Sequence, residues 1–545
     1  MTKDMGVPDW WRGAVIYQVY PRSFQDSDGD GIGDLKGITA RLDHIAALGV
    51  DAIWISPFFK SPMADMGYDV SDYRDVDPMF GSLADFDALL ARAHERGLRI
   101  IIDQVISHTS DQHAWFRESR SSRDNPRADW YVWADPKPDG TAPNNWLSIF
   151  GGPAWEWDGT RMQYYMHSFL SSQPDVNYHA PAVQDAMIEE MRFWLDRGVD
   201  GFRLDACNHY FHDAKLRDNP PAVRMAAHDI PETNPYGFQE HKYDKTQPEN
   251  IAYLKRIRAL LEEYPGSVAV GEVGDGDRSP QTVGIYTSGG DTLHFCYTFD
   301  LFGTEFTPAM FRDTVTKFLA SAEDGWVCWA LSNHDVMRHV SRFAKPGDDP
   351  NRIGRLAIAI LVALRGAICL YQGEELALPE ADIAFEDLRD PYGIRFWPSF
   401  KGRDGCRTPM PWSRDEDQAG FSSARPWLPI PAEHKARAVD AQEADPRSML
   451  HFYRRALAWR RSSTALQCGD IDFIDAGDDI LAFTRVAGAE VVLCLYNMSG
   501  EPRDWPLPAA YATALVEPLS APGITVNRKT LRLPALGWAF LRRPA

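Results

Sequence analysis

The sequence predicts an α/β protein built on a closed (β/α)8 barrel, a TIM barrel, with an inserted subdomain after strand three and a C-terminal antiparallel β domain. Eight short apolar runs alternate with amphipathic helical patterns up to residue 461, which indicates a parallel sheet. Polar residues follow several of these runs, and such residues at strand ends favour a closed barrel over an open sheet. After residue 462 the pattern changes to short strands separated by turn residues.

The elements are assigned in chain order from these patterns. We expect the eight barrel strands at residues 14–20, 51–55, 98–105, 199–204, 267–272, 292–299, 326–331 and 367–371. We expect helices at residues 38–48, 83–96, 183–197, 251–263, 310–319, 352–364 and 449–460. In the first of these helices, apolar residues recur at helical spacing. The C-terminal strands are expected at residues 471–474, 480–486, 491–496, 514–517, 530–533 and 538–541.

Two insertions interrupt the alternation. Residues 109–178 are rich in Trp, Pro and Asn and show no helical pattern, so we expect an irregular inserted subdomain. Residues 374–445 follow strand eight, and loops of this length at the carboxyl face of a barrel usually shape the pocket. The expected units are the barrel at 1–108 and 179–461, the insertion at 109–178, the strand-eight insertion at 374–445 within the barrel domain, and a β-sandwich at 462–545.

Composition excludes several classes of partner. The 545 residues include 57 Lys and Arg against 77 Asp and Glu, a net charge of −20. So acidic a chain repels phosphate backbones and anionic lipids, which argues against nucleic acid and membrane partners. The sequence shows no signal-peptide pattern and no apolar run of membrane-spanning length. Seven scattered cysteines without paired spacing predict buried free thiols, which fits a reducing cytoplasm.

The stretch at residues 201–206 carries the first chemical signal. Arg203 and Asp205 alternate along a strand and therefore point the same way. A neighbouring arginine keeps a carboxylate ionised, and an ionised, oriented carboxylate is what a nucleophile at a sugar carbon requires. For this pair in isolation, a structural ion pair that caps the strand would be the better interpretation.

Other strand ends supply partners for this pair. Strand three ends in Asp103 to His108, strand five in Glu272, and strand seven in His334 and Asp335. Glu272 follows an apolar run, so burial is expected to raise its pKa, which suits a proton donor. A charged and a protonated carboxyl beside one scissile bond is the glycosidase pattern, and a separation of about 5–5.5 Å gives a covalent intermediate and retention.

These motifs resemble the α-amylase superfamily, glycoside hydrolase family thirteen, in its α-glucosidase and oligo-1,6-glucosidase branch. The matching stretches are residues 103–108, 173–177, 201–205, 271–273, 332–335 and 371–375, in the family's order. The resemblance implies that Asp205 is the nucleophile, Glu272 the acid/base and Asp335 the transition-state stabiliser. It also implies a set of residues around the innermost sugar: Tyr68, His108, Phe150, Phe169, Arg203 and His334.

The same branch implies a pocket closed by Asp65 and an arginine. We prefer Arg407 to Arg403 for this role, because Arg407 directly precedes Thr-Pro-Met in the family's similar motif. A closed pocket makes the enzyme exo-acting. In this branch the residue after the nucleophile tends to be Val in α-1,6-cleaving members and Ala or Thr in α-1,4-cleaving ones, so Ala206 favours maltose-like substrates.

The expected activity is therefore that of a retaining, exo-acting α-glucosidase that acts on a small oligosaccharide or glucoside, with transglucosylation alongside. An oligo-1,6-glucosidase, or a sucrose- or trehalose-type isomerase or glucosyltransferase on the same site, are the alternatives. A non-catalytic barrel would lack one of the three acids, and all three are present. No organic cofactor is expected, and the sequence does not indicate an oligomeric state.

Residues 26–34 predict a metal loop. Carboxylates at alternate positions with glycines between them suit a hard cation. An EF-hand is excluded, because Gly37 takes the place of its final glutamate and no helix precedes the loop. The resemblance implies a structural Ca²⁺ or Mg²⁺ that stabilises and does not catalyse, held by Asp26, Asp28, Asp30, Asp34 and the carbonyl of Ile32. A solvated acidic loop without metal is the alternative.

Overall fold

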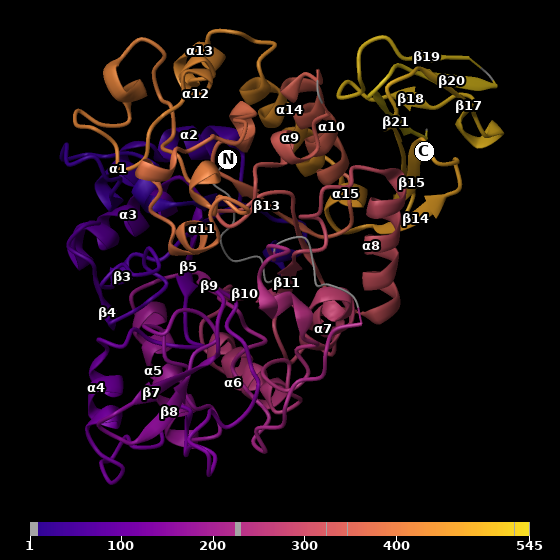
Figure 1. Cartoon of the computed structure of the whole chain (residues 1–545). Coiled ribbons are helices and arrows are strands. Elements are labelled where there is room, and N and C mark those ends of the chain that lie inside the picture. The colour runs from indigo at the N-terminus through magenta and orange to yellow at the C-terminus, as the bar shows by residue number, and fades with distance from the viewer. Residues whose placement is uncertain (1–8, 224–229, 323, 346, 528, 544–545) are drawn as a thin grey trace.

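Eight parallel strands form the centre of the computed structural model, which describes residues 9–223, 230–322, 324–345, 347–527 and 529–543. Their order in the sheet is β11-β10-β9-β5-β2-β1-β13-β12. A parallel bridge between Cys296 and Val327 joins the two ends of this order, so the sheet closes into the predicted barrel (Figure 1). The strands are β1 (Val15–Val19), β2 (Ala52–Ile55), β5 (Arg99–Gln104), β9 (Gly201–Leu204), β10 (Val268–Val273), β11 (Phe295–Thr298), β12 (Cys328–Ala330) and β13 (Ala367–Tyr371).

Helices cover the outside of the barrel. They are α1 (Leu35–Ala40), α2 (Leu42–Leu48), α3 (Leu83–Glu95), α5 (Pro181–Asp196), α6 (Asn250–Glu262), α7 (Ser279–Thr287), α8 (Pro308–Ser321), α9 (His339–Arg342), α10 (Pro350–Leu361) and α14 (Met449–Arg461). The single helix expected at 38–48 is wrong: the chain breaks at Arg41 and forms α1 and α2. A short hairpin of β3 (Phe59–Lys60) and β4 (Asp72–Val76) follows β2.

Helix α7 was not expected from the sequence. Most of its residues are buried, polar and apolar alike, so it has no alternation of polar and apolar faces. Its Gly284 packs against α8 so closely that a Cβ there would lie 2.3 Å from the carbonyl oxygen of Ser321. The exposed face carries the apolar Ile285 and the buried face carries Ser279, Thr282 and Thr287, so hydrophobicity does not mark which side of this helix is buried.

The alternation of strand residues separates the barrel interior from the helix-facing layer. Ile16, Ile101 and Val270 belong to the interior core, whereas their neighbours in the chain pack against the helices. Gly201 lets β9 approach β10, because a Cβ at this position would lie 2.2 Å from the carbonyl oxygen of Val268. Continuing the same alternation to the carboxyl ends of the strands directs Arg203 and Glu272 inward.

The insertion at residues 109–178 is more regular than the sequence indicates. It contains α4 (Ala114–Ser121) and a three-stranded antiparallel sheet of β6 (Trp133–Ala134), β8 (Gln163–Met166) and β7 (Trp155–Asp158). The expectation of an irregular subdomain without a helix is therefore wrong. These elements are too short for a periodic pattern, and aromatic contacts such as the stacked rings of Phe116 and Trp133 hold them together.

The strand-eight insertion lies over the carboxyl end of the barrel beside that subdomain (Figure 1). Its helices are α11 (Pro391–Phe396), α12 (Ala432–Ala436) and α13 (Val439–Glu443). The contact between the ring of Phe150 and the ring of Tyr392, 5.0 Å apart, joins the two insertions. The boundaries of both insertions stay a prediction.

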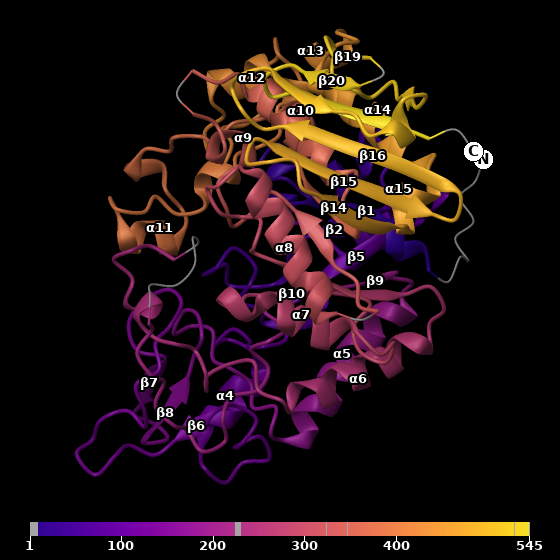
Figure 2. The same cartoon turned by 90° about the vertical axis from the view of Figure 1, so that its right-hand side faces the viewer.

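The C-terminal residues form two packed antiparallel sheets after α15 (Thr464–Cys468). Figure 2 shows the larger sheet beside the barrel helices. One sheet has the order β14-β15-β16-β21-β18 and the other β17-β20-β19. Side chains such as Leu493, Trp505 and Leu531 form the core between them. The strands are β14 (Asp470–Ile474), β15 (Ile480–Ala487), β16 (Glu490–Asn497), β17 (Arg503–Pro506), β18 (Leu515–Val516), β19 (Thr525–Val526), β20 (Thr530–Leu533) and β21 (Trp538–Arg542).

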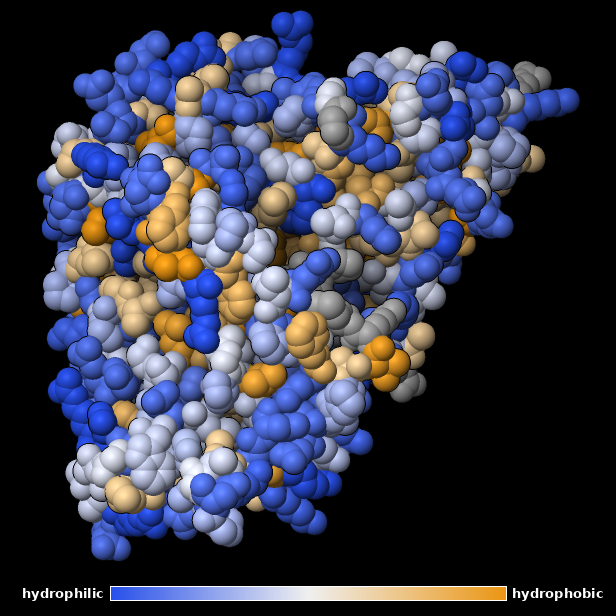
Figure 3. Space-filling view, in the orientation of Figure 1, coloured by the Kyte–Doolittle hydropathy of each residue, from blue (hydrophilic) through white to orange (hydrophobic). Residues whose placement is uncertain are grey.

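The face of the molecule shown in Figure 3 is mainly polar. On the face in Figure 3, apolar residues lie in separate groups between polar ones. No helix in the part of the chain that the structure describes combines the length and apolar character of a membrane-spanning helix.

Candidate active site

Arg203 lies at the centre of the polar groups that the barrel strands bring together. Its side chain is fully buried, and its Nη1 donates to Asp103 at 2.8 Å and to Asp205 at 2.5 Å. Its Nη2 lies 2.6 Å from Oε1 of Glu272. The sequence predicted the Arg203–Asp205 contact. The other two contacts arise because β5 and β10 are the neighbours of β9 in the closed sheet.

Glu272 is held by two further donors. The hydroxyl of Tyr297 donates to Oε1 at 2.8 Å, and the backbone N–H of Ala206 donates to Oε2 at 2.8 Å. Ala206 adopts a left-handed conformation, with φ of 40°, which is uncommon for a residue other than glycine. This turn directs the N–H of the residue after Asp205 at the neighbouring carboxyl group.

Burial raises the pKa of both carboxyl groups. It raises the pKa of Glu272 to about 7, as predicted, against the opposing charge of Arg203 and with the charge of Asp205 adding to the rise. The expectation that Arg203 keeps the pKa of Asp205 low is wrong: burial outweighs Arg203 and raises that pKa to about 7 as well. The charge of Asp205 opposes ionisation of Glu272, and the charges of Asp103 and Asp335 oppose ionisation of Asp205, so the cluster favours a retained proton near neutral pH.

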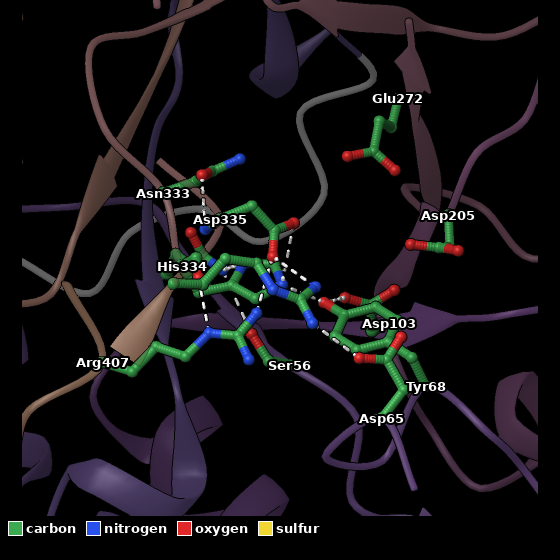
Figure 4. A network of polar contacts seen from close by, with 12 residues as sticks. Ser56, Asp65, Tyr68, Asp103, Asp205, Glu272, Asn333, His334, Asp335 and Arg407 are labelled. Carbon is green, nitrogen blue, oxygen red and sulfur yellow. Dashed lines mark hydrogen bonds and ion pairs between the residues drawn. The ribbon is translucent and has the colours of Figure 1, made fainter. Parts of the chain in front are cut away.

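Asp335 faces these two acids across an open space (Figure 4). It accepts from Nη2 of Arg407 at 2.7 Å and from Nη1 of Arg403 at 3.2 Å, and it lies 3.3 Å from Nε2 of His334. Burial acts to raise its pKa, but His334 and the two arginines together hold that pKa well below the usual range. Asp335 is therefore ionised at neutral pH.

The arginine beside Asp65 is Arg403. Its Nη2 lies 2.7 Å from Asp65, and the same guanidinium pairs with Asp390 at 2.8 Å. Arg403 and not the preferred Arg407 therefore makes the contact with Asp65, and the part that Arg407 plays in closing the pocket stays a prediction. Arg407 lies at the site too, but its Nε donates to the backbone carbonyl of His334, so its side chain is directed at Asp335.

Aromatic rings and histidines form the walls of the site. Tyr68 stacks on His334 at 5.3 Å, and its hydroxyl lies 2.6 Å from Nε2 of that ring. His108 contacts Phe169 at 5.1 Å, and Phe169 contacts Phe150 at 6.0 Å. The structure thus brings together the sugar-binding residues predicted from the strand ends and from the insertion.

Several residues of the site were not among the predicted ones. They are Gln18, Asp103, Gln173, Tyr297 and Arg403. Gln18 contacts Nδ1 of His334 at 2.7 Å, and Gln173 donates to Asp65 at 3.2 Å. Gln173 and Arg403 stand in loops, where alternation gives no signal. Gln18, Asp103 and Tyr297 stand in strands noted in the sequence, and alternation along those strands was the available signal. Their partners lie on other strands, and the sequence does not show which strands become neighbours.

The predicted metal loop is only partly assembled. Carboxylate oxygens of Asp26, Asp28 and Asp34 lie within 4.8 Å of one another, and Asp30 is not part of this group. Asp26 also accepts from the N–H groups of Gly29 and Gly31. Three carboxylates at this spacing fit a hard cation.

Comparison with known proteins identifies a family of glycoside hydrolases, in agreement with the geometry of the site. The family model described as "Alpha amylase, catalytic domain" matches residues 18–469. A relative from Rhizobium meliloti (strain 1021), named "Probable alpha-glucosidase", is 59% identical over 539 residues, which cover 98% of this chain and 97% of the relative. An oligo-1,6-glucosidase of Parageobacillus thermoglucosidasius is 36% identical over 92% of each chain.

A solved structure of a related enzyme has the same fold. The crystal structure of an alpha-glucosyl transfer enzyme, XgtA, is 54% identical, covers 98% of this chain and 99% of its own, and superposes with a TM-score of 0.95. The match to the family model, the sequence identity over nearly the whole chain and the geometry of the site lead to the same result. The chain belongs to the α-amylase family of glycoside hydrolases.

Proposed function

We propose that this protein is a retaining, exo-acting α-glucosidase that releases glucose from the non-reducing end of short α-1,4-glucosides. The observation that carries the proposal is that one guanidinium, that of Arg203, contacts both Asp205 and Glu272. Two carboxyl groups that share one guanidinium lie close together, which favours the separation of about 5–5.5 Å in retaining enzymes over about 6.5–9.5 Å in inverting ones.

In the first step, a carboxylate oxygen of Asp205 attacks the anomeric carbon while Glu272 gives its proton to the departing glycosidic oxygen. The product is a covalent glucosyl-enzyme. In the second step, Glu272 takes a proton from water, which attacks the same carbon and releases glucose. Ionised Asp335 accepts hydrogen bonds from sugar hydroxyls and so supports the distortion of the sugar ring in the transition state.

The exo-acting character rests on the closed end of the site. Asp65 and Arg403 form an ion pair with both side chains less than a tenth exposed, and Arg403 is anchored in turn on Asp390. The guanidinium of Arg403 also lies over the ring of Phe150, 5.1 Å from its centre. A wall of this kind supports a pocket for one terminal glucose and not an open cleft.

The linkage preference rests on Ala206. Its small side chain beside the nucleophile supports α-1,4 substrates, and a methyl-scale difference is worth about 1–3 kcal/mol in a pocket. The identity to an oligo-1,6-glucosidase favours the α-1,6 alternative, and the identity to an alpha-glucosyl transfer enzyme supports transfer to other alcohols beside hydrolysis. A sucrose- or trehalose-type isomerase uses the same acids and stays an alternative.

The test is product analysis with maltose, isomaltose and sucrose as separate substrates. We expect glucose from maltose, at a higher kcat/KM than from isomaltose, and α-configured glucose as the first anomer detected by NMR. Transfer products should increase with substrate concentration. The Asp205→Asn variant is the control, because its loss of activity ties the products to this site. Glucose released first as the β-anomer, or sucrose isomerised faster than maltose is cleaved, would contradict the proposal.

We also propose a structural cation in the loop at 26–34, with Asp26, Asp28 and Asp34 as carboxylate ligands. Asp30 and the carbonyl of Ile32 complete the set implied by the family resemblance. The loop at 26–34 is distant in sequence from the acids Asp205, Glu272 and Asp335. The cation would stabilise this loop after β1. A cytoplasmic location is proposed as well, supported by seven cysteines that are all free thiols.

A further inference from the structure

Tyr297 and Glu272 lie side by side on neighbouring strands of the barrel. They are register partners on the parallel strands β11 and β10, and both side chains continue the inward alternation of their strands. Tyr297 is 2% exposed. Its hydroxyl therefore meets the carboxyl group inside the barrel, away from bulk water.

The direction of the Tyr297–Glu272 hydrogen bond follows from the chemistry of Arg203. Nε and Nη2 of Arg203 lie 3.2 Å and 2.7 Å from the Tyr297 hydroxyl oxygen. A guanidinium only donates, so the lone pairs of that oxygen accept from Arg203. The single hydroxyl hydrogen is left for Oε1 of Glu272, 2.8 Å away.

The two oxygens of Glu272 are consequently not equivalent. Oε1 accepts from the hydroxyl of Tyr297 and forms an ion pair with Nη2 of Arg203 at 2.6 Å, and the donor and the positive charge both disfavour a proton on this oxygen. Oε2 faces one donor, the backbone N–H of Ala206. A proton on the carboxyl group is accommodated at Oε2 only.

We propose that Tyr297 is a positioning residue that anchors Oε1 of Glu272 and so assigns the transferable proton to Oε2. Tyr297 does not touch the reacting atoms in this scheme and acts through Glu272. It stabilises the ionised form of Glu272 by donating to it, which makes Glu272 a stronger acid when it gives its proton to the departing oxygen in the first step. This inference rests on the proposed function, because it assumes that Glu272 is the acid/base.

The test is the pH dependence of kcat/KM for the Tyr297→Phe variant. Loss of the donor destabilises the carboxylate, so we expect the alkaline limb to move up by about one pH unit, with the acid limb nearly unchanged. We expect kcat/KM to fall about tenfold for maltose. An aryl α-glucoside with a good leaving group should lose clearly less, because its departure needs little proton transfer.

A second variant should shift the alkaline limb in the opposite direction. Tyr297 replaced by 3-fluorotyrosine keeps the shape of the ring but has a more acidic hydroxyl, which is a better donor, so the alkaline limb should move down. If Tyr297→Phe does not fold, this variant decides alone. The matched control is Tyr178→Phe, which removes a buried tyrosine hydroxyl that donates to the backbone carbonyl of Ile106 at 2.8 Å and should leave the limb in place.

The possible results separate clearly. Opposite shifts in the two Tyr297 variants and none in the control support the inference. An alkaline limb that stays in place in the folded Tyr297 variants overturns it, as does an equal shift in Tyr178→Phe. A wild-type protein that cleaves neither maltose nor an aryl α-glucoside refutes the proposed function instead, so the two failures are distinguishable.

Discussion

Arg203 forms ion pairs with three carboxyl groups but carries only one positive charge. Asp103, Asp205 and Glu272 all lie within 2.8 Å of its guanidinium, and the arginine is fully buried. With all three acids ionised, the buried cluster would carry a net charge of −2, and desolvation makes that costly. A retained proton lowers this cost. The raised pKa values of the acids follow from the same imbalance.

The activity should therefore depend on pH as a bell with its maximum near neutrality. Below about pH 7 a second proton enters the pair and neutralises the nucleophile Asp205, so kcat/KM falls. Above about pH 7 Glu272 loses the proton that it must donate, and kcat/KM falls again. The measurement is kcat/KM for maltose across the pH range at constant ionic strength. A rate that rises steadily into alkaline solution would contradict the assignment of Glu272 as acid.

Glu272→Gln removes the proton donor and keeps the shape of the side chain. We expect kcat/KM for maltose to fall by about 10²–10⁴-fold. An aryl α-glucoside with a good leaving group should retain most of its first step, visible as a burst of released phenol in stopped-flow. Equal losses on both substrates would count against the acid role. Circular dichroism of the variant controls for folding.

At the scale of elements, the loop between β1 and α1 shows how local chemistry and tertiary contacts combine. Asp34 caps α1 by accepting from the N–H of Gly37 at 2.7 Å. Asp26 accepts from Ser422 of the strand-eight insertion at 2.5 Å. Gly31 has a φ of 93°, and a Cβ there would lie 2.2 Å from the carbonyl oxygen of Arg425. The loop thus ties the first strand to the last insertion.

The effect of Asp28→Asn on the melting temperature should have opposite signs with and without a bound cation. This carboxylate is exposed, and Asp26 and Asp30 contribute to raising its pKa after the effect of burial. With a bound cation, Asp28→Asn should lower the melting temperature and abolish the destabilisation caused by EDTA, with kcat below the transition unchanged. Without a cation, the same change relieves repulsion and raises the melting temperature. Thermal unfolding with and without EDTA, Ca²⁺ and Mg²⁺ distinguishes the two cases.

The elements also show where pattern reasoning succeeds. The eight strands were predictable because each is a short, continuous apolar run, and the long helices, such as α3 and α14, because apolar residues recur on one face at a regular period. Helix α7 was not, since its exposed face carries the apolar Ile285 while polar residues such as Thr282 are buried. Within the site, alternation predicted that Arg203 and Asp205 share a direction. It did not predict that Tyr297 meets Glu272, since register between strands is set by the closed sheet.

At the scale of the whole molecule, one buried arginine joins the C-terminal sheets to the barrel. Arg485 of β15 is fully buried, and its guanidinium donates to the backbone carbonyls of Ala363, Leu364, Leu466 and Gly469. Burial lowers its pKa to about 9. The carbonyls after helix α10 are thereby satisfied by a side chain from another unit, which makes the docking specific as well as apolar.

Arg485→Met should loosen this docking. The buried carbonyls lose their donor, and we expect the free energy of unfolding to fall by about 3 kcal/mol, with kcat unchanged at temperatures where the variant is folded. Thermal and urea unfolding measure the loss. The control is Arg532→Met, which removes an exposed ion pair with Asp504 and should cost about 1 kcal/mol or less. Equal losses in the two variants would refute the role of Arg485.

The sequence by itself determined the barrel, the order of its strands along the chain, the three acids at strand ends and the family to which they belong. These features are local, because period, strand ends and motif spacing are written in consecutive residues. Only the tertiary structure decided that Arg203 is shared, that Arg403 and not Arg407 meets Asp65, and that burial raises the pKa of Asp205. Each of these depends on which distant segments become neighbours and on how much water their contact removes.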